Sequence, residues 1–282
     1  MKTALIMEGG AMRGMFTCGV IDVLLREGIT VDAAAGISAG AVFGCNYKSR
    51  QIGRALRYNK KYGGDPRYCS VRSLIKTGDL YGAEFCYHTL PDELDVFDRA
   101  ASRENPMKFY VGATDLQTGQ CLYHECADGG SEDMQWLRAS ASMPLVSRPV
   151  HVGEHVLLDG GIADAVPFEY MEKLGYRRNI VILTQPRRYR KSPAKGLWLY
   201  RLLLRRYPAV AAAMVVRADM YNRQMEALDR REAAGESLLL RPPQALGIGH
   251  CEKNPDELQR VYDLGSREAE ERIGEIRRFL GL

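Results

Sequence analysis

The sequence contains no CxxC pair, only five histidines and no long run of apolar residues. Its seven cysteines, an odd number at scattered positions, indicate neither a disulfide framework nor a redox motif and fit a reducing cytoplasm. Charge-free stretches such as residues 207–216 are far shorter than the roughly 20 residues that a membrane-spanning helix needs. The apolar run after Lys2 is too short for a signal peptide. We therefore expect a cytoplasmic protein, with any membrane contact peripheral and at the inner membrane surface.

The composition is that of an ordinary globular protein, with 46% apolar and 26% charged residues in a chain of 282. This length suffices for one large α/β domain. Because neither an internal repeat nor a linker is visible, the sequence predicts a single domain over residues 1–282. Residues 186–250 are expected to form a cap or a membrane-facing helical region within it. The formal net charge of +4 is too small to indicate a nucleic-acid partner.

The N-terminal part of the chain alternates between strand and helix patterns. Residues 2–7, "KTALIM", are typical of a buried strand, and residues 15–28 have apolar side chains at helical spacing. Residues 29–37 predict a second strand, and residues 38–56 predict a second helix that begins at or beside Ser38. We expect the two strands to lie parallel in a right-handed βαβ unit.

The later segments predict a mixed sheet in an α/β fold. Residues 107–115 and 120–126 are typical of a β-hairpin, and residues 155–161 and 178–186 of two more core strands. Towards the end of the chain, a helix is expected to begin with Asn254 as its cap and Pro255 in its first position. The last predicted element is an amphipathic helix over residues 266–280.

The stretch "GISAG", residues 36–40, places Ser38 where a strand ends and a helix begins. Gly36 and Gly40 remove side chains that would collide across so tight a turn, which predicts an exposed hydroxyl. The N-terminus of the helix favours negative charge nearby. Ser38 is therefore a candidate nucleophile, but it needs a base to take its proton. None of the five histidines lies in a stretch typical of a catalytic base.

The glycine-rich stretch "EGGAMRG", residues 8–14, follows the first strand. If the first two strands pair, the backbone N–H groups of this stretch lie beside Ser38, where they could stabilise an oxyanion. The alternative is a nucleotide phosphate site. However, Ala11 stands at the middle position of the G-x-G-x-x-G pattern, and Gly14 is followed by Met15 rather than by the lysine of a P-loop.

The stretch "LLDGGIADAVPF", residues 157–168, offers a base in Asp159. A carboxylate near its ordinary pKa of about 3.9 is a weak base, so the role requires a poorly solvated pocket or an attack in which proton transfer lags. The alternative is that Asp159 and Gly160 simply mark a turn. The catalytic hypothesis requires the side chains of Ser38 and Asp159 to meet at the ends of adjacent strands.

These three motifs, in this order, resemble the patatin-like phospholipase family, whose members use a serine–aspartate dyad without a histidine. The resemblance covers roughly residues 3–185. It rests on Gly9, Gly10, Arg13 and Gly14, on Ser38, on "ASASMP" at residues 139–144, and on Asp159, Gly160 and Gly161 with the Asp164 and Pro167 that follow.

By this likeness Ser38 is the nucleophile and Asp159 the general base, and neither a metal nor an organic cofactor is required. The resemblance also implies a three-layer α/β/α fold with a mixed, mainly parallel central sheet. The expected reaction is hydrolysis of a lipid or fatty acyl ester through an acyl-enzyme.

The oxyanion hole implied by the resemblance consists of the backbone amides around Gly9, Gly10 and Ala11. Arg13 would support this loop together with Gly14. Ala11 departs from the family pattern, which commonly has a third glycine here. A methyl group restricts the backbone, so the departure concerns the fine geometry of the hole and leaves its N–H in place.

Two other functions remain open on the sequence alone. The first is a lipid- or nucleotide-binding protein that keeps the fold without turnover. The second is a serine–histidine–aspartate esterase with Ser38, Asp159 and His250, since His250 is the one histidine that follows Asp159.

Two further clusters contain side chains that could bind a metal ion or a membrane. Cys121, His124 and Cys126 invite a metal site, but on a strand Cys121 points away from the other two side chains, so the sequence favours none. Residues 187–206 contain eight basic and no acidic residues. On a helix, Trp198, Leu199, Leu202 and Leu203 would lie opposite Arg201 and Arg205. This pattern predicts peripheral contact with an anionic membrane, or equally a helix that packs this face on the core.

Overall fold

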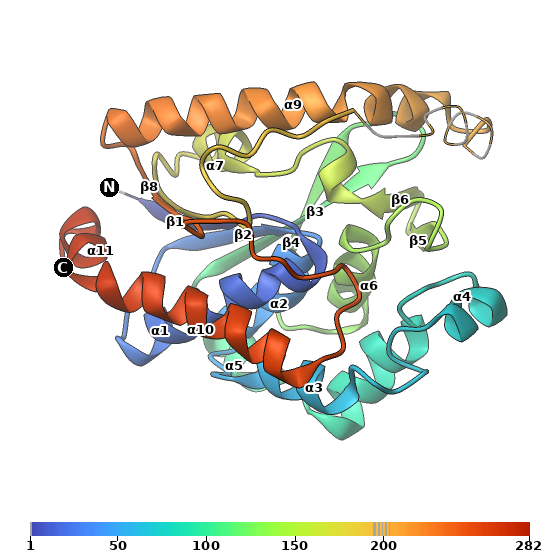
Figure 1. The fold of residues 1–282 in the computed structure, drawn as a ribbon, viewed down its shortest axis with the longest axis horizontal. Coiled ribbons are helices and arrows are strands. Elements are labelled where there is room, and N and C mark those ends of the chain that lie inside the picture. The colour runs from blue at the N-terminus through green and yellow to red at the C-terminus, as the bar shows by residue number, and fades with distance from the viewer. Residues whose placement is uncertain (1, 194–195, 197, 199, 201, 203) are drawn as a thin grey trace.

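Figure 1 shows a computed structural model of the chain, in which a central sheet lies between two layers of helices. The structure describes residues 2–193, 196, 198, 200, 202 and 204–282. In this part of the chain the sheet has eight strands. They are β1 (Thr3–Met7), β2 (Ala33–Ile37), β3 (Lys108–Asp115), β4 (Cys121–Cys126), β5 (Val150–Val152), β6 (His155–Asp159), β7 (Arg178–Ile182) and β8 (Ser237–Leu240).

The sheet is mixed, as the sequence predicts. Strands β3, β2, β1, β7 and β8 lie side by side and parallel. Strands β4 and β6 pair with β3 in the antiparallel direction, and β5 pairs with β6 in the same way. The predicted parallel βαβ unit and the predicted hairpin are both confirmed.

Helices cover both faces of the sheet (Figure 1). Side chains of β1 alternate between the two sides, because Leu5 and Met7 belong to one apolar cluster and Ala4 and Ile6 to another. The first cluster packs against α1 (Met15–Arg26), α2 (Ala39–Lys48), α6 (Ser131–Ser140) and α10 (Pro255–Glu271). The second packs against α7 (Phe168–Lys173) and α9 (Pro208–Ala233). The three-layer α/β/α architecture is therefore confirmed.

Two predicted helices are each interrupted. The helix expected over residues 38–56 ends at Lys48, and a separate helix, α3 (Arg54–Tyr62), follows. Gly53 between them has a φ of 73°, and its N–H donates to the carboxylate of Asp22 at 2.8 Å, so the chain turns there. The helix expected over residues 266–280 is likewise divided at Arg272 into α10 and α11 (Ile273–Leu280).

The start of α10 follows the prediction. The side chain of Asn254 accepts a hydrogen bond from the N–H of Asp256 at 3.0 Å, so it caps α10 as expected. All seven cysteines are free thiols. Within the described residues, no helix is both long and apolar enough to cross a bilayer.

The remaining helices of the described residues are short. Within residues 186–250, α9 covers one face of the sheet and β8 pairs with β7. The other short elements are α4 (Val71–Thr77), a π-helical segment (Phe85–Leu94), α5 (Arg99–Glu104), and two 3-10 turns, Ala11–Gly14 and Gly160–Ile162.

Candidate active site

Ser38 occupies a strained turn between β2 and α2. Its backbone angles are φ 55° and ψ −123°, a conformation that costs energy for a residue with a side chain. The turn is also tightly packed, because a Cβ atom at Gly36 would lie 2.4 Å from the carbonyl oxygen of Gly40. A Cβ atom at Gly40 would lie 2.3 Å from the carbonyl oxygen of Met7. Both glycines of the motif are therefore required by close backbone approach.

The structure brings the side chains of Ser38 and Asp159 together. The Ser38 hydroxyl donates to Asp159 Oδ2 at 2.6 Å, and the Gly161 N–H donates to Asp159 Oδ1 at 2.8 Å. Asp159 is only 5% exposed. Both oxygens of the carboxylate thus have a partner, and one of these partners is the candidate nucleophile.

The strands that carry this pair are not neighbours in the sheet, which corrects the expectation that they would be adjacent. Both β2 and β6 pair with the edge of β3 opposite β4, with Ile37 beside Gly112 and Asp159 beside Ala113. Because β2 runs parallel to β3 and β6 runs antiparallel, their C-terminal ends face each other along that edge. The hydroxyl and the carboxylate meet where the two strands end.

Burial raises the pKa of Asp159 above its ordinary value. The hydrogen bond from Ser38, the positive charge of Arg217 and the N–H of Gly161 oppose this rise without cancelling it. A carboxylate with a raised pKa is a stronger base for a hydroxyl proton. The poorly solvated pocket that the catalytic hypothesis requires is therefore present.

The segment "ASASMP" supports both members of the pair, a role that the sequence alone did not indicate. The buried hydroxyl of Ser140 accepts from the N–H of Ser38 at 2.9 Å and donates to the carbonyl of Gly112 at 2.6 Å. Two residues later, the carbonyl of Ser142 accepts from the N–H of Asp159 at 2.8 Å. One short segment therefore holds the backbone at both ends of the contact.

The glycine-rich turn lies against Ser38, as the pairing of β1 with β2 predicts. A Cβ atom at Gly9 would lie 2.9 Å from the Cβ atom of Ser38. Among the described residues, no protein acceptor takes a hydrogen bond from the backbone N–H groups of Gly9, Gly10 or Ala11. Ala11 has a φ of 50°, in the left-handed region that favours glycine. These donors lie beside the candidate nucleophile, and one of them belongs to a strained residue.

Arg13 and Gly14 have different surroundings. The N–H of Arg13 donates to the carbonyl of Gly10 at 3.1 Å, which closes the turn. The guanidinium of Arg13 lies 3.4 Å from Nε2 of His250. Gly14 packs on α2, since a Cβ atom there would lie 2.7 Å from the ring of Phe43.

Glu8, which the sequence analysis did not single out, braces the start of this turn. It is buried, and Oε2 accepts from the N–H of Thr184 at 2.5 Å while Oε1 accepts from the hydroxyl of Tyr221 at 2.9 Å. Burial raises the pKa of Glu8. Thr184 also donates from its hydroxyl to the carbonyl of Gly9 at 3.2 Å.

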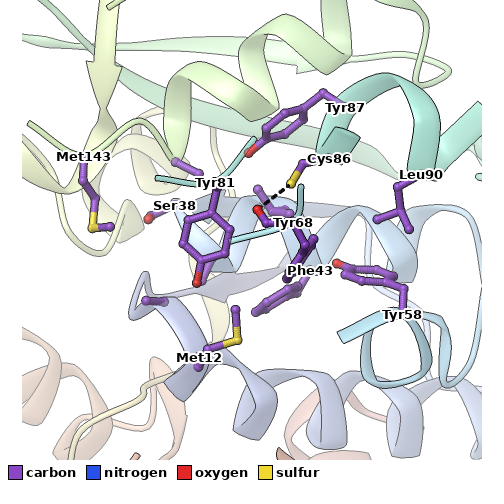
Figure 2. Close-up of a pocket in the computed structure, with 14 residues that line it drawn as sticks. Met12, Ser38, Phe43, Tyr58, Tyr68, Tyr81, Cys86, Tyr87, Leu90 and Met143 are labelled. Carbon is purple, nitrogen blue, oxygen red and sulfur yellow. Dashed lines mark hydrogen bonds between the residues drawn. The ribbon is translucent and has the colours of Figure 1, made fainter. Parts of the chain in front are cut away.

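An apolar pocket opens beside Ser38 (Figure 2), and its empty space, counted together with the open solvent at its mouth, is about 630 Å³. In Figure 2, Ser38 and Met143 lie at one end of the view and Leu90 and Tyr58 at the other. The hydroxyl of Tyr68 donates to the buried Asn59 at 2.6 Å. Apart from the thiol of Cys86, the remaining lining is aromatic or aliphatic, including Met12, Phe43, Tyr81 and Tyr87.

A second hollow, of about 1940 Å³ and open to solvent, meets the apolar pocket at Ala11, Ser38 and Met143. Its lining includes Asp159 and four basic side chains. These four are Arg13, Lys191, Arg217 and His250. Although much of the lining of this hollow is apolar, these charged side chains distinguish it, and it is named the polar hollow for them. Ser38 thus lies at the boundary between the apolar pocket and the polar hollow.

His250 lies in the polar hollow but does not mediate the contact between Ser38 and Asp159. Its ring is close to Arg13, and Asp159 accepts directly from the Ser38 hydroxyl. Burial and the positive charges of Arg13, Lys191 and Arg217 lower the pKa of His250. The geometry does not favour the serine–histidine–aspartate alternative.

Asp164, part of the resemblance, is held away from Ser38. Its carboxylate accepts from the hydroxyl of Tyr123 and, at 2.6 Å, from the amide of Gln224. This contact joins the turn after β6 to α9.

The cysteine and histidine side chains of β4 point to opposite sides of the sheet, as the alternation of side chains along a strand predicts. His124 and Cys126 lie near Asp133, and the three offer ligand atoms within 4.8 Å of one another. His124 Nε2 is hydrogen-bonded to Asp133 Oδ1 at 2.7 Å, and Oδ2 accepts from two backbone N–H groups, so the carboxylate closes the loop before α6. Cys121 points to the other side, near Gly112.

The described apolar and aromatic side chains of the basic segment 187–206 lie in two environments, solvent and the protein core. Trp198 and Leu202 are 70% and 54% exposed. Tyr200 and Leu204 pack instead on a cluster around Leu158 and Val210. Three members of the predicted helix, Leu199, Arg201 and Leu203, lie outside the described residues.

Comparison with known proteins gives two family matches. The model of the patatin-like phospholipase family matches residues 5–171, more than half of the chain. The model of a domain of unknown function, DUF6363, matches residues 207–281.

Similar individual proteins are distant. YjjU of Escherichia coli is 28% identical over 219 residues, which are 71% of this chain and 56% of YjjU. Lysophospholipase NTE1 of Debaryomyces hansenii is 26% identical over 186 residues, 64% of this chain and 12% of that protein. The crystal structure of VipD from Legionella pneumophila gives a TM-score of 0.47 at 11% identity and covers 96% of this chain and 66% of that one. The chain thus spans about half of YjjU and a small part of the lysophospholipase.

Proposed function

The chain belongs to the patatin-like phospholipase family, and we propose that it hydrolyses carboxylic esters of lipids with Ser38 as nucleophile and Asp159 as general base. The observation that carries this proposal is the 2.6 Å hydrogen bond from the Ser38 hydroxyl to Asp159 beside an apolar pocket. A serine, a base and an apolar site for an acyl chain are the parts that lipid acyl transfer needs.

In the first step, Ser38 Oγ attacks the carbonyl carbon of the ester while its proton moves to Asp159 Oδ2. The hydrogen bond already connects these two oxygens, so the proton transfer needs no intervening histidine. The raised pKa of Asp159 favours the transfer. The Gly161 N–H keeps the second carboxylate oxygen in place.

The negative charge that forms on the carbonyl oxygen requires donors. The backbone N–H groups of Gly9, Gly10 and Ala11 lie in the turn packed against Ser38 and have no acceptor among the described residues. Preorganised donors of this kind are each worth about 3 kcal/mol in a transition state. We assign these groups to the oxyanion hole.

In the remaining steps, Asp159 returns its proton to the leaving alcohol, and an acyl ester on Ser38 remains. A water molecule then attacks this acyl carbonyl as Asp159 takes one of its protons. Ser38 Oγ leaves and recovers a proton from Asp159, and a carboxylic acid is released. The acyl chain would occupy the aromatic pocket throughout, because this pocket opens beside the nucleophile.

Covalent labelling with a fluorophosphonate probe tests the proposal. The folded wild-type protein should react, and Ser38→Ala should not. Ser192→Ala is a matched control, because Ser192 lines the polar hollow but has no base beside it among the described residues. Lipid mass spectrometry of products formed from a mixed lipid extract should then show free fatty acid that depends on Ser38. A wild-type protein that neither reacts nor releases fatty acid would contradict the enzyme assignment.

We also propose that residues 187–206 bind an anionic membrane surface peripherally. The support is the exposure of Trp198 and Leu202 in a segment with eight basic residues and no acidic one. Aromatic and aliphatic side chains among basic ones are typical of segments that lie in the lipid interface. Tyr200 and Leu204 would hold the same segment on the protein.

A further inference from the structure

The polar hollow beside the dyad gathers three cationic side chains from distant parts of the chain. Arg13 comes from the glycine-rich turn, Lys191 from the segment after β7, and Arg217 from the middle of α9. In the part of the chain that the structure describes, no carboxylate oxygen lies within 4.0 Å of these three groups. Such an unpaired cluster is costly in the absence of an anion.

The two carboxylates in the hollow already have partners. Glu8 accepts from Thr184 and Tyr221, and Asp159 accepts from Ser38 and Gly161. Neither carboxylate lies within ion-pair distance of the three cations in the described part of the chain, and the cations outnumber these carboxylates by three to two. The positive charge remains available to a bound molecule.

The backbone of Lys191 is held by the side chain of Asn222. Its N–H donates to the side chain of Asn222 at 2.8 Å, and its carbonyl accepts from the same side chain at 3.0 Å. The ammonium group lies 4.7 Å from the centre of the Tyr221 ring. Burial, together with the charges of Arg217 and Arg13, lowers the pKa of Lys191 to about 8. The backbone of Lys191 is thus anchored, and its ammonium is partly desolvated and still charged at neutral pH.

Arg217 is oriented by one of its nitrogens. Its Nε donates at 2.6 Å to the carbonyl of Gly161, the residue whose N–H holds the Asp159 carboxylate. Its terminal nitrogens have no acceptor among the described residues. Arg13 contributes a buried Nε that likewise lacks a partner there.

We propose that Lys191 and Arg217, with Arg13 beside them, form a subsite for a phosphate group carried by the alcohol half of the ester. This inference rests on the proposed function. The apolar pocket and the polar hollow meet at Ser38, so an ester bound across the nucleophile places its acyl chain in one space and its alcohol in the other. Arginine and lysine together suit a phosphate, whose several oxygens accept charge-assisted hydrogen bonds.

Lys191 and Arg217 lie outside residues 5–171, and Arg217 lies within residues 207–281. The proposed subsite thus joins the region of the patatin-like match to the C-terminal region. The selectivity for the leaving group would come from residues outside the patatin-like match.

Matched substrates test the subsite. The kcat/KM values for 1-palmitoyl-glycerol 3-phosphate and for 1-palmitoyl-glycerol are compared below their micellar concentrations, with p-nitrophenyl butyrate as a small neutral ester. Wild type should prefer the phosphate ester. Lys191→Met should lower kcat/KM for it by about tenfold to a hundredfold and change the neutral esters by less than about threefold. Arg217→Met should lower kcat/KM for the phosphate ester by about tenfold more than for the neutral esters, which also lose rate because Arg217 contacts Gly161 next to Asp159.

Arg223→Met is the control, because Arg223 is exposed on the same helix and its replacement removes the same charge. It should leave all three kcat/KM values within about twofold. Equal losses on phosphate and neutral esters in Lys191→Met and Arg217→Met would overturn the inference, since the two cations would then act through Asp159 rather than on the leaving group.

A binding experiment separates the subsite from the catalytic proposal. In the Ser38→Ala background, calorimetry measures the Kd of 1-palmitoyl-glycerol 3-phosphate and of 1-palmitoyl-glycerol, with and without Lys191→Met. Tighter binding of the phosphate ester that depends on Lys191 supports the subsite even if the wild type proves inactive. Equal affinity for the two lipids overturns it even if the wild type is an active esterase. Displacement of the lipid by glycerol 3-phosphate but not by inorganic phosphate would show that a lipid head group, rather than free phosphate, is the ligand.

Discussion

The buried hydroxyl of Ser140 accepts the backbone N–H of Ser38 at 2.9 Å and donates to the carbonyl of Gly112 at 2.6 Å. Ser140 therefore connects the strained turn to β3, the strand along which β2 and β6 meet end to end. The position of Ser38 relative to Asp159 depends on this contact as well as on the two glycines of the turn.

Replacement of Ser140 by alanine should lower kcat by about tenfold or more and reduce the free energy of unfolding by about 1–3 kcal/mol. The loss of stability follows because the N–H of Ser38 and the carbonyl of Gly112 lose a buried partner. The loss of kcat follows because the turn is no longer held in register with Asp159. Steady-state kinetics and urea unfolding measure the two effects.

Ser73→Ala provides the matched control for Ser140→Ala. Ser73 is also buried and donates to a backbone carbonyl, that of Asp79, at 2.7 Å. It lies in α4, so its loss should lower stability without changing kcat. If Ser140→Ala also changed stability alone, Ser140 would be a structural residue and not a positioning residue.

Much of the site could be predicted from local sequence patterns. Ser38 at a strand-to-helix turn and the glycine-rich stretch beside it both follow from short motifs on consecutive elements, because two successive parallel strands usually pair. The end-to-end meeting of β2 and β6 could not be predicted in this way. It depends on an antiparallel pairing of β6 with β3, a contact between residues more than forty positions apart.

The cationic residues of the polar hollow could not be recognised either. Lys191 lies in a segment whose composition indicates a membrane surface, and Arg217 is one of several basic residues on a long helix. Their convergence is a property of how α9 packs across the sheet, which no local pattern describes. Ser140 belongs to the motif at residues 139–144, but its role depends on the tertiary contact with Ser38.

Replacement of Asp159 by asparagine should lower kcat/KM for esters by about a hundredfold or more, because an amide cannot take the Ser38 proton. The same change should leave the Tm equal or raise it. Burial raises the pKa of Asp159, so the folded chain binds this proton more tightly than the unfolded chain does. Ionisation of the group therefore reduces stability as the pH rises through the interval between its ordinary and its raised pKa, and asparagine removes this cost.

Asp115→Asn is the control for this prediction. Asp115 is buried at the end of β3, where its carboxylate accepts from the N–H groups of Gln117 and Thr118. Its replacement should reduce the Tm while activity stays within about threefold. Full activity of Asp159→Asn would remove Asp159 as the base.

Replacement of both Trp198 and Leu202 by serine should weaken binding to vesicles that contain anionic lipid by about tenfold, because both side chains are exposed in a basic segment. Co-sedimentation with vesicles at low and high salt measures the effect. The control is Val216→Ser combined with Leu282→Ser, since both of these apolar residues are also exposed. Equal binding of the two double variants would exclude residues 187–206 as the membrane contact.

Replacement of Ala11 by glycine should raise the free energy of unfolding by up to about 1 kcal/mol. Ala11 has a φ of 50°, where a residue with a Cβ is disfavoured by about 1–2 kcal/mol, and the greater freedom of an unfolded glycine offsets part of this gain. The N–H of residue 11 remains, so kcat should stay within about threefold.

The reverse substitution at Gly28 is a matched test of the same strain. Gly28 has a φ of 65° and no atom within 4 Å of the position that a Cβ would occupy. Gly28→Ala should therefore lose about 1 kcal/mol from backbone strain alone. A loss of stability in Ala11→Gly of that size would mean that the methyl group of Ala11 contributes packing that outweighs its strain.

The preference for a phosphate ester should decline as the pH rises through about 8, because Lys191 then loses its proton. The ratio of the kcat/KM values for 1-palmitoyl-glycerol 3-phosphate and 1-palmitoyl-glycerol, measured as a function of pH, follows the loss of this proton. The substrate phosphate, with a second pKa of about 6, is already a dianion in this range. The groups that act on Lys191 in the hollow are Glu8, Arg13, Asp159, Arg217, Tyr221 and His250.

The variant Lys191→Arg distinguishes the titration of Lys191 from the titration of these other groups. A guanidinium stays charged above pH 12, so this variant should keep its preference for the phosphate ester through pH 9. Because the substitution leaves Asp159 and Ser38 unchanged, the neutral ester should show the same pH profile in both proteins. A decline at pH 8 that persisted in Lys191→Arg would assign the titration to another group and remove Lys191 from the subsite.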